Sequence, residues 1–286
     1  MQRLTYPSFR TVLEERAFVR VAGVNHALGG LLAEEAGCDA VWSSSLEVSA
    51  CRGVPDASIL TMSEYLEAAA NIQKVLQIPV VADCDTGYGG TMNVAHMMHE
   101  YEAAGITAVC LEDKRFPKMN SFVGTGQHLL DTGEFTTKIS VAKRAQTSPE
   151  TFFIARTEAL IVGQPVAEAL ERCRAYADSG ADAVLIHSKA KTRDQIMAFL
   201  DGWDFRVPVV VVPTTYPDWQ IDEMRAAGVS VVIYANQGLR ATVAALRDTY
   251  AAILRHGDST IVEGSIASVR DIFDLQRLAE WQKLEV

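Results

Sequence analysis

The sequence predicts a TIM-type (β/α)8 barrel, and three observations carry this prediction. Eight runs rich in β-branched residues alternate with helical patterns over about 250 residues. Several helical patterns end in glycine, as helix C-termini commonly do. The runs are almost continuously apolar, so both faces of the sheet should be buried and the strands should be parallel. The predicted strands are residues 18–24, 39–45, 78–85, 106–113, 151–157, 181–188, 207–214 and 229–236.

An open, doubly wound sheet is the alternative fold, but no GxGxxG pattern follows the first run. Beyond the eighth unit, residues 265–282 form a further amphipathic segment, which packs either as a lid on its own barrel or onto a neighbouring subunit. We assign residues 1–286 to one domain, in which 240–286 include this helical extension. The apolar side of the segment carries Ile266, Val269, Ile272, Phe273 and Trp281.

Composition restricts the partners of the protein. The formal charge of −10 argues against nucleic acid and anionic membranes, although local cations can still bind an anionic substrate. No apolar stretch approaches the roughly 20 residues of a membrane helix, and the first residues lack the apolar core of a signal peptide. The five cysteines are scattered, which indicates reduced packing residues in a cytoplasmic protein.

Acidic side chains gather where two neighbouring strands end. Asp83 and Asp85 are two residues apart and share one face of a strand, and Glu112 ends the next strand. Three carboxylates this close repel one another unless a cation lies among them, and hard oxygen ligands suit Mg²⁺. The alternative to a metal site is that these acids form ion pairs with basic residues of the following segment, namely Lys114, Arg115 or Lys118.

The segment after Glu112 supplies cations and hydrogen-bond donors for an anion. Lys118 is one of its cations, and Asn120 and Ser121 are its donors. The glycine-containing loop 122–127 could open and close over the site. Arg156 ends the fifth strand, where a guanidinium can clamp a carboxylate or phosphoryl group.

Other strand ends carry further candidates. The "WSSSL" segment offers the hydroxyls of Ser44 and Ser45 with backbone N–H groups, a plausible cradle for a carboxylate. Asp56 either caps the following helix or belongs to the site. The glycines of "DTGYGGT" are expected to let the backbone pass close to the metal site. The remaining strand-end candidates for substrate binding are Trp42, Leu46 and His187.

With these residues assembled, the chain resembles the phosphoenolpyruvate mutase/isocitrate lyase superfamily, in its phosphoenolpyruvate mutase branch. "DCDTGYGG" is similar to the DxDxGYG strand of that family, and "EDKRFPKMNS" to its EDKxFPKxNS loop. "WSSSL", "GVPD", "ARTEA", "VLIHSK", "VVPTTY" and "VIYAN" follow in the expected order. The resemblance covers almost the whole chain.

The resemblance implies a Mg²⁺-dependent barrel that forms a homotetramer, a dimer of helix-swapped dimers. It implies that Ser44, Ser45 and Leu46 hold the substrate carboxylate, although Ser45 stands where these mutases usually have glycine. The other implied roles are Mg²⁺ binding for Asp83, Asp85 and Glu112, anion binding for Arg156 and His187, and a gate for Asn120 and Ser121. Asp56 is implied to lie beside the phosphoryl group in transit, either as a transient acceptor or as a guide.

The implied reaction interconverts phosphoenolpyruvate and 3-phosphonopyruvate. The alternative is a phosphonopyruvate hydrolase that forms pyruvate and phosphate, and hydrolases that resemble this chain tend to carry threonine at the position of Asn120. A carbon–carbon lyase is less favoured, because the chain lacks the KxCGH motif of those relatives and reads "KMNS" there. A non-catalytic binding protein is the last alternative. The presence of all four acids of the implied site argues against it, and these are Asp56, Asp83, Asp85 and Glu112.

Overall fold

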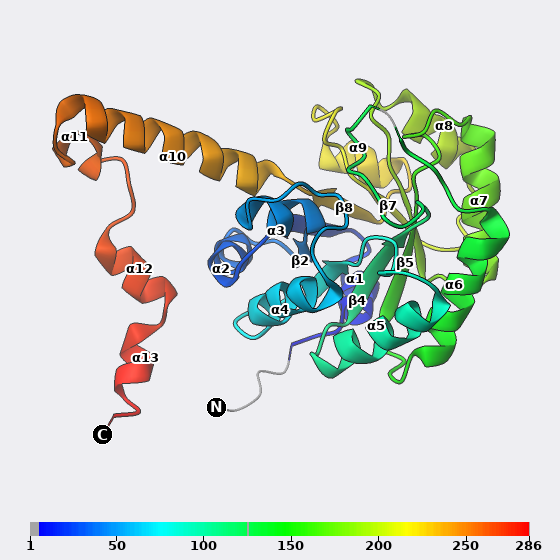
Figure 1. Cartoon of the computed structure of the whole chain (residues 1–286), viewed down its shortest axis with the longest axis horizontal. Helices are drawn as coiled ribbons and strands as arrows, with labels where there is room; N and C mark the ends of the chain where they lie inside the picture. Colours follow the sequence, from blue (N-terminus) through cyan, green and yellow to red (C-terminus); the bar gives the residue numbers. More distant parts are fainter. Residues whose placement is uncertain (1–5, 125, 286) are drawn as a thin grey trace. The chain divides into compact units, whose positions relative to one another are not determined.

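The computed structural model of the chain describes residues 6–124 and 126–285. The chain forms two compact units, of which the first ends at Asn236 and the second begins at Gln237. The first unit is a closed barrel of eight parallel strands that pair in sequence order, with β8 beside β1 (Figure 1). The predicted TIM-type barrel is therefore confirmed, whereas the assignment of the whole chain to one domain stays a prediction.

Every predicted strand is present and lies within its predicted range. The strands are shorter than the apolar runs because ladder pairing stops where the chain turns into the loops. They are β1 (Val19–Val24), β2 (Ala40–Ser43), β3 (Val80–Asp83), β4 (Ala108–Glu112), β5 (Phe152–Thr157), β6 (Ala183–Ile186), β7 (Val209–Val211) and β8 (Val231–Tyr234).

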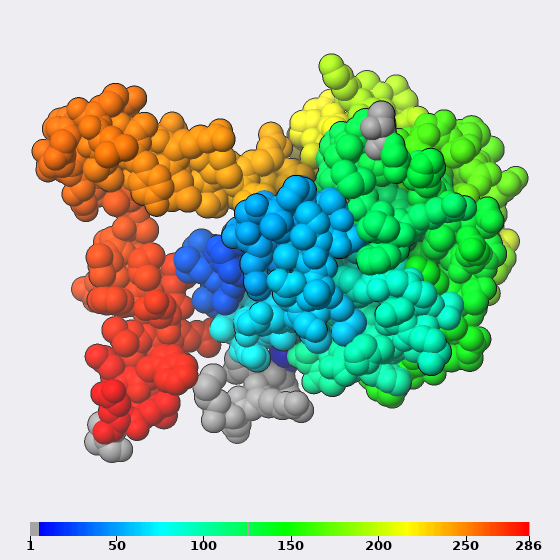
Figure 2. Space-filling view, viewed as in Figure 1, coloured from blue at the N-terminus to red at the C-terminus, as the bar shows by residue number. Residues whose placement is uncertain are grey.

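The helices of this unit follow the strands and cover the outside of the barrel. Figure 2 shows one face of the unit, which is covered by side chains of the blue, cyan and green segments. The helices are α1 (Phe9–Arg16), α2 (Ala27–Glu35), α3 (Ser45–Cys51), α4 (Met62–Gln73), α5 (Thr91–Ala103), α6 (Thr132–Ala145), α7 (Val166–Asp178), α8 (Asp194–Gly202) and α9 (Ile221–Ala226).

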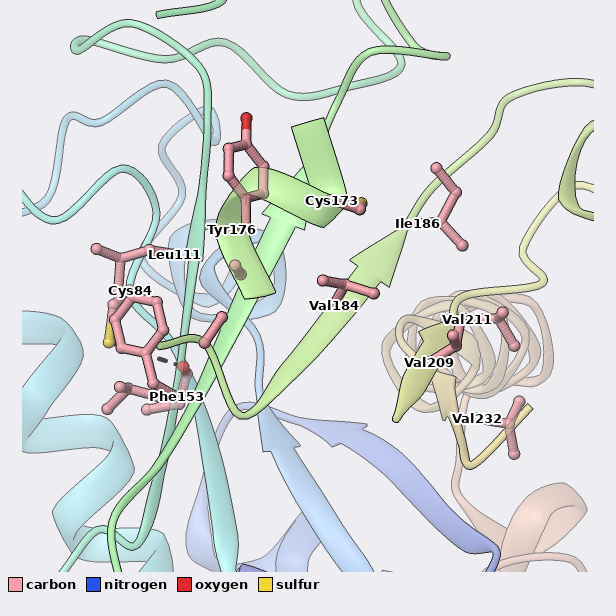
Figure 3. Packing of buried hydrophobic residues seen from close by; sticks show 14 of the residues in the cluster. Cys84, Leu111, Phe153, Cys173, Tyr176, Val184, Ile186, Val209, Val211 and Val232 are labelled. Atoms are coloured by element: carbon pink, nitrogen blue, oxygen red, sulfur yellow. Dashed lines mark hydrogen bonds between the residues drawn. The ribbon is translucent and has the colours of Figure 1, made fainter. Parts of the chain in front are cut away.

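The strand residues alternate between two apolar layers. Val81, Cys110 and Ile154 belong to the inner cluster, which fills the barrel. Their neighbours in sequence point outward to the helices, because successive side chains of a strand face opposite ways. Figure 3 shows part of this outer layer, where Cys173 and Tyr176 of α7 lie among residues of several strands. This alternation decides which residues at the strand ends can face the barrel axis.

Helix α1 closes the amino-terminal end of the barrel, an element that the sequence analysis did not predict. Ser8 caps the helix by accepting a hydrogen bond from the Thr11 N–H. Phe9 is fully buried in the inner cluster, and its ring packs edge-on against Phe152 with the ring centroids 5.3 Å apart. Because Phe152 begins β5, this packing lies at the end of the barrel opposite the predicted site.

The second unit consists of helices only within its described residues. The predicted amphipathic segment 265–282 is not one helix, since Arg277 adopts a left-handed conformation (φ 54°) and separates two short helices. Val269 and Trp281 of its apolar side are 68% and 54% exposed. The helices are α10 (Gln237–His256), α11 (Thr260–Glu263), α12 (Val269–Leu275) and α13 (Leu278–Gln282).

All five cysteines are free thiols, as predicted. Cys84, Cys110 and Cys173 are buried and serve packing, but Cys51 is exposed, so the prediction of a packing role is wrong for that residue. Within the described residues, no helix is both long and apolar enough to cross a membrane.

Replacing Phe9 with alanine should destabilise the barrel by about 3–5 kcal/mol, because the change leaves a cavity in the inner cluster. Urea denaturation followed by circular dichroism measures the free energy of unfolding. Met92→Ala is the control, since that side chain is 82% exposed. A loss below about 1 kcal/mol for Phe9→Ala would show that α1 does not support the barrel.

Candidate active site

The alternation of the strands turns charged side chains at their carboxyl ends toward the barrel axis. Asp83 ends β3 with the same orientation as Val81, and Glu112 ends β4 with the orientation of Cys110. Glu112 lies opposite Arg156 of β5 in the strand register. The barrel therefore places the acids and the guanidinium at one end, where TIM-barrel enzymes hold their active sites.

A pocket opens at this end of the barrel, and it brings together eleven of the thirteen predicted site residues. The two exceptions are Asp85 and Glu112, which are buried and do not line it. The lining residues are Trp42, Ser44, Ser45, Leu46, Asp56, Asp83, Lys118, Asn120, Ser121, Phe122, Arg156, His187, Val212, Thr214, Ala235 and Asn236.

Asp85 is held in an unusual turn directly after β3. Its backbone is left-handed (φ 48°), a conformation that costs energy for a residue other than glycine and often marks a functional site. The Glu112 N–H donates to the Asp85 carbonyl oxygen at 2.8 Å, and Lys138 Nζ of α6 donates to the Thr86 carbonyl oxygen at 2.8 Å. These two bonds fix the turn from both sides.

The glycine after this turn has a packing role. A Cβ atom on Gly87 would lie 2.5 Å from Val94 Cγ2 of α5, and the residue has φ 83°. Gly87 therefore allows the turn to pack against α5, and the role of the glycines of "DTGYGGT" beside a metal site stays a prediction.

Lys118 is the cation at the centre of the acidic side of the pocket. Its Nζ donates to Asp56 Oδ1 at 2.6 Å and lies 3.1 Å from Asp85 Oδ1 and 3.3 Å from Ser45 Oγ. Asp56 does not cap α4, because Thr61 is the N-cap of that helix, so the alternative of a helix cap is wrong. Lys118, together with Asn120, outweighs the effect of burial and lowers the pKa of Asp56 below its usual value.

The ion pairs leave the described part of the site with an excess of negative charge. Five carboxylates face three cations, so the formal charge is −2 when all are ionised. Burial raises the pKa of Asp85 to about 7, and Lys118 opposes this effect only in part. The carboxylates are Asp56, Asp83, Asp85, Glu112 and Glu158, and the cations are Lys114, Lys118 and Arg156.

The donor set fits a divalent cation that keeps part of its water. Among the described residues, no donor makes a hydrogen bond to either buried carboxylate oxygen of Asp85 or to buried Glu112 Oε1. Asp85 Oδ1 and Glu112 Oε1 have only the ion-pair contacts of Lys118 and Lys114. Buried polar atoms seldom lack partners. The described residues contain no group of three potential ligands around one point. Mg²⁺ commonly binds through one or two carboxylates and keeps several waters, so Asp85 is the best candidate for a direct ligand.

The alternative of ion pairing is also present. Lys118 lies near Asp85, and Lys114 Nζ lies 3.7 Å from Glu112 Oε1. The third basic residue that we considered, Arg115, instead donates from Nε to the Leu129 carbonyl oxygen at 3.2 Å. The pairs and a divalent ion are compatible, because the pairs leave the charge of −2 uncompensated.

Lys114 and Asn120 connect the loop after β4 to the floor of the pocket. Lys114 is buried, and its Nζ donates to the Met119 carbonyl oxygen and to Ser121 Oγ, each at 2.9 Å. Asn120 Nδ2 donates to Asp56 Oδ2 at 2.7 Å, and Asn120 Oδ1 accepts from the Phe122 N–H at 3.0 Å. The charged and polar side chains of this segment therefore hold the loop in place, and some of them also face the pocket.

Arg156, His187 and Glu158 form a second cluster at the pocket, and Glu112 joins it to the acids because Arg156 Nε lies 3.3 Å from Glu112 Oε2. Arg156 Nε donates to Glu158 Oε1 at 2.6 Å, and Arg156 Nη2 lies 3.1 Å from His187 Nδ1. Burial lowers the pKa of His187, so its imidazole is neutral near pH 7. The sequence analysis did not assign Glu158 or Lys114 to the site. Glu158 follows Arg156 by two residues, and this spacing could have indicated that both face the barrel axis.

The "WSSSL" segment is tied to the acidic side. Ser44 caps α3 by accepting from the Glu47 N–H, so its hydroxyl already has a structural role. Ser45 Oγ donates to Asp83 Oδ2 at 2.8 Å, and the Ser45 N–H is 3.2 Å from the same oxygen. The side chain of Ser45, which has no counterpart in a protein with glycine here, therefore anchors Asp83.

A parallel eight-stranded barrel with a pocket lined by acids and cations at its carboxyl end defines a TIM-barrel enzyme. Within this class the chain belongs to the phosphoenolpyruvate phosphomutase family, whose model matches residues 9–254, and so to the phosphoenolpyruvate mutase/isocitrate lyase superfamily.

Relatives of two activities resemble the chain over nearly its full length. It is 42% identical to the phosphonopyruvate hydrolase of Variovorax sp. (strain Pal2), in an alignment that covers 94% of this chain and 93% of the relative. It is 38% identical to the phosphoenolpyruvate phosphomutase of Streptomyces hygroscopicus, over 93% of this chain and 85% of the relative.

Solved structures of both kinds share the fold. The phosphoenolpyruvate phosphomutase from Streptomyces platensis subsp. rosaceus matches with a TM-score of 0.95 and 50% identity, over 96% of each chain. A phosphonopyruvate hydrolase in complex with oxalate and Mg²⁺ matches with a TM-score of 0.91 and 40% identity, also over 96% of each chain. The family is thus shown, and the two activities are both represented among its similar members.

The raised pKa of Asp85 predicts how the stability of the metal-free protein depends on pH. A carboxyl with a raised folded-state pKa contributes stability below its unfolded pKa of about 4, and this contribution is lost as the pH rises through 7. Wild type should therefore lose about 2 kcal/mol relative to Asp85→Asn between pH 5 and pH 8. Urea denaturation in EDTA at each pH measures this difference.

Glu67→Gln is the matched control, because the side chain of Glu67 is 64% exposed. The control should follow wild type at every pH. A difference between wild type and Asp85→Asn that does not change with pH would contradict the raised pKa.

Proposed function

We propose that the protein is a Mg²⁺-dependent phosphoenolpyruvate mutase, which interconverts phosphoenolpyruvate and 3-phosphonopyruvate. The proposal rests on the family membership and on a pocket with acids on one side and Arg156 and His187 on the other. The alternative is a phosphonopyruvate hydrolase, which the 42% identical relative supports. A carbon–carbon lyase is less favoured, since "KMNS" stands where those enzymes have KxCGH.

The two charged ends of the substrate suit the two sides of the pocket. We place the carboxylate at the start of α3, where Ser45 and Leu46 line the pocket, and the phosphoryl group beside Arg156 and His187. A guanidinium provides paired donors that match a phosphoryl group. The nearby donors Asn120 and Ser121 belong to the loop that connects both sides.

Asp85 would bind Mg²⁺ directly, and Asp83 and Glu112 would act through its water. Bound Mg²⁺ would supply a Lewis acid that neutralises negative charge on the oxygens of the pyruvyl group. The Ser45 hydroxyl orients Asp83, and the Glu112 N–H orients the turn that carries Asp85. The polypeptide therefore holds its acids in place through contacts that do not depend on the ion.

The reaction breaks the bond between phosphorus and the enol oxygen and forms a bond between phosphorus and C3. The enol oxygen becomes the ketone oxygen, so no proton enters or leaves. In phosphoryl transfer of this kind the protein contributes chiefly by positioning the substrate and stabilising its charge. Arg156 would stabilise the charge of the phosphoryl group. Water must stay out during the transfer, because it would capture the phosphoryl group and give phosphate.

The contact between Asn120 and Asp56 is the observation that favours the mutase. The Asn120 amide bridges Asp56 on the floor of the pocket and the Phe122 N–H in the loop, so it closes the loop over the acidic side. A closed loop excludes the water that a hydrolase requires. Lys118 holds Asp56 from the other side, and Asp56 would act on the phosphoryl group either as a transient acceptor or as a guide.

A phosphorus NMR time course with phosphonopyruvate and Mg²⁺ tests the function. Wild type should give phosphoenolpyruvate as the main product. Asn120→Ala should lower the rate of isomerisation by about 10- to 100-fold and raise the share of inorganic phosphate, because the loop loses its contact with Asp56. Gln77→Ala, a change in an exposed residue outside the pocket, is the control.

Two outcomes would contradict the proposal. Inorganic phosphate and pyruvate as the main products of wild type would make the protein a hydrolase. The same product ratio and rate for Asn120→Ala and wild type would show that this amide does not control the phosphoryl group.

We further propose that the protein forms a homotetramer, a dimer of helix-swapped dimers. The second unit carries apolar side chains that its own helices do not bury: Leu254 is 84% exposed and Leu284 is 71% exposed. None of the described residues of α10 is buried. Apolar surface of this extent is typical of an interaction site. The cytoplasmic location stays a prediction.

Truncation after Gly264 should reduce the assembly, because it removes α12 and α13. Light scattering coupled to gel filtration should give four times the mass of the chain for the full-length protein and a smaller multiple for the truncated one. Lys283→Ala serves as the control and should keep the full mass. A full-length monomer, or a truncated protein with the same number of chains as wild type, would refute the proposed assembly.

A further inference from the structure

Glu158 is a fully buried carboxylate that connects the anion side of the pocket to the loop after β4. Its side chain has no exposed surface. Oε1 accepts from Arg156 Nε at 2.6 Å and lies 3.1 Å from His187 Nδ1. Oε2 accepts a hydrogen bond from Ser121 Oγ and lies 3.1 Å from Lys114 Nζ. All four partners are groups that line the pocket or anchor its loop.

Burial of a carboxylate is costly, and a residue that served packing alone would not need the charge. Here Arg156, Lys114 and His187 together outweigh the effect of burial and hold the pKa of Glu158 well below its usual value. The carboxylate is therefore ionised, and each of its oxygens can only accept hydrogen bonds.

We propose that Glu158 is the positioning residue of the anion site, which fixes the guanidinium of Arg156 and selects the Nδ1–H tautomer of His187. This inference rests on the proposed function in one respect, the anionic substrate that these groups would face. Glu158 does not line the pocket itself and acts through its partners.

The tautomer follows from the neighbours of the imidazole. His187 Nδ1 lies 3.1 Å from Glu158 Oε1, which can only accept a hydrogen bond, and 3.1 Å from Arg156 Nη2, which can only donate one. The two neighbours therefore favour opposite protonation states of Nδ1. Arg156 Nη2 has another acceptor in Ser121 Oγ at 3.1 Å. A hydrogen bond to an ionised carboxylate is about twice as strong as one between neutral groups, so Nδ1 keeps its proton and donates to Glu158.

This tautomer leaves the other ring nitrogen for the pocket. His187 Nε2 is buried and has no hydrogen-bond partner among the described residues, and His187 lines the pocket. The charged groups around the ring are Arg156 and Glu158 from β5 and its loop and Lys114 from the loop after β4. Phe122 packs edge-on against the ring, with the centroids 5.9 Å apart, and restricts its rotation.

The backbone of Glu158 is fixed from outside the barrel. Asp113 points away from the barrel axis and accepts from the Glu158 N–H at 2.8 Å and from Thr157 Oγ1 at 2.8 Å. Tyr176 of α7 donates to the same Asp113 carboxylate at 2.7 Å. The two acids thus have separate tasks: Asp113 fixes the chain, and Glu158 orients the groups that face the pocket.

The tautomer can be measured in the wild-type protein without any substrate. Histidine labelled with ¹⁵N in the rings, at pH 8, gives a correlation spectrum in which coupling patterns distinguish Nδ1–H from Nε2–H. The signal that disappears in His187→Gln assigns the residue. We expect Nδ1–H. A ring protonated at Nε2 with a bare Nδ1 would overturn the proposal, whatever the activity of the enzyme.

Kinetics of two variants test the positioning of Arg156. Glu158→Gln keeps the volume of the side chain and removes its charge, so a packing role predicts wild-type activity. The proposal predicts a loss of about 100-fold in kcat/KM, carried mostly by kcat, because the groups that face the transition state lose their orientation. Glu158→Asp keeps the charge and should recover part of the loss. Glu67→Gln, an exposed carboxylate, controls for a change in net charge.

The results that would overturn this inference differ from those that would overturn the proposed function. A folded Glu158→Gln protein with activity within about twofold of wild type would overturn the positioning role. If wild type converts neither phosphonopyruvate nor phosphoenolpyruvate, the proposed function fails, while the Nδ1–H tautomer of His187 still decides the role of Glu158. If Glu158→Gln does not fold, the wild-type spectrum and Glu158→Asp carry the test.

Discussion

The concentration of buried negative charge at the carboxyl end of the barrel is the constraint on which the site depends. Carboxylates from several strand ends converge there because the strands of the barrel all point the same way. Isolated, they would repel one another and lose their hydration, which costs several kcal/mol for each ion. The structure compensates most of this charge with Lys114, Lys118 and Arg156, and the remaining −2 matches the charge of one divalent cation.

The compensation also organises the loop that covers the site. Lys114 and Lys118 come from one short segment after β4, and each contacts acids and loop atoms at the same time. The loop is therefore held by ion pairs as well as by the packing of Phe122 against His187. A change of charge in the pocket would act directly on these contacts, so a bound anion or cation would be coupled to the loop through the same few side chains. Asn120 is the link between this loop and Asp56.

Much of the fold and part of the site could be predicted from the sequence. The eight strands were predictable because near-continuous apolar runs, regularly alternating with helical patterns, are typical of buried parallel sheets. Eleven of the predicted site residues line one pocket, since they stand at strand ends or in motifs that resemble a known family. Helix α1 was missed although Phe9, Val12 and Leu13 have the i, i+3, i+4 spacing of a buried helix face, because it is only eight residues long and precedes the first strand. Its importance comes from the barrel end that it fills.

The roles of individual acids could not be predicted, because they depend on contacts between distant segments. Asp56 lies 62 residues before Lys118 in the chain, and only the folded loop shows that it is an ion-pair partner and not a helix cap. Glu158 was missed because a carboxylate two residues after Arg156 has no meaning until Lys114, Ser121 and His187 surround it. The mutase and hydrolase relatives are too similar to this chain for sequence to separate them.

Proton release on metal binding tests the central claim, that a divalent cation and a proton compete for the buried negative charge around Asp85. Calorimetric titration of the metal-free protein with Mg²⁺, in two buffers of different ionisation enthalpy, measures the protons released. Because the pKa of Asp85 is raised to about 7, we predict release of about half a proton per ion at pH 7 and almost none at pH 9. The same release at both pH values, or no binding of Mg²⁺, would contradict the account.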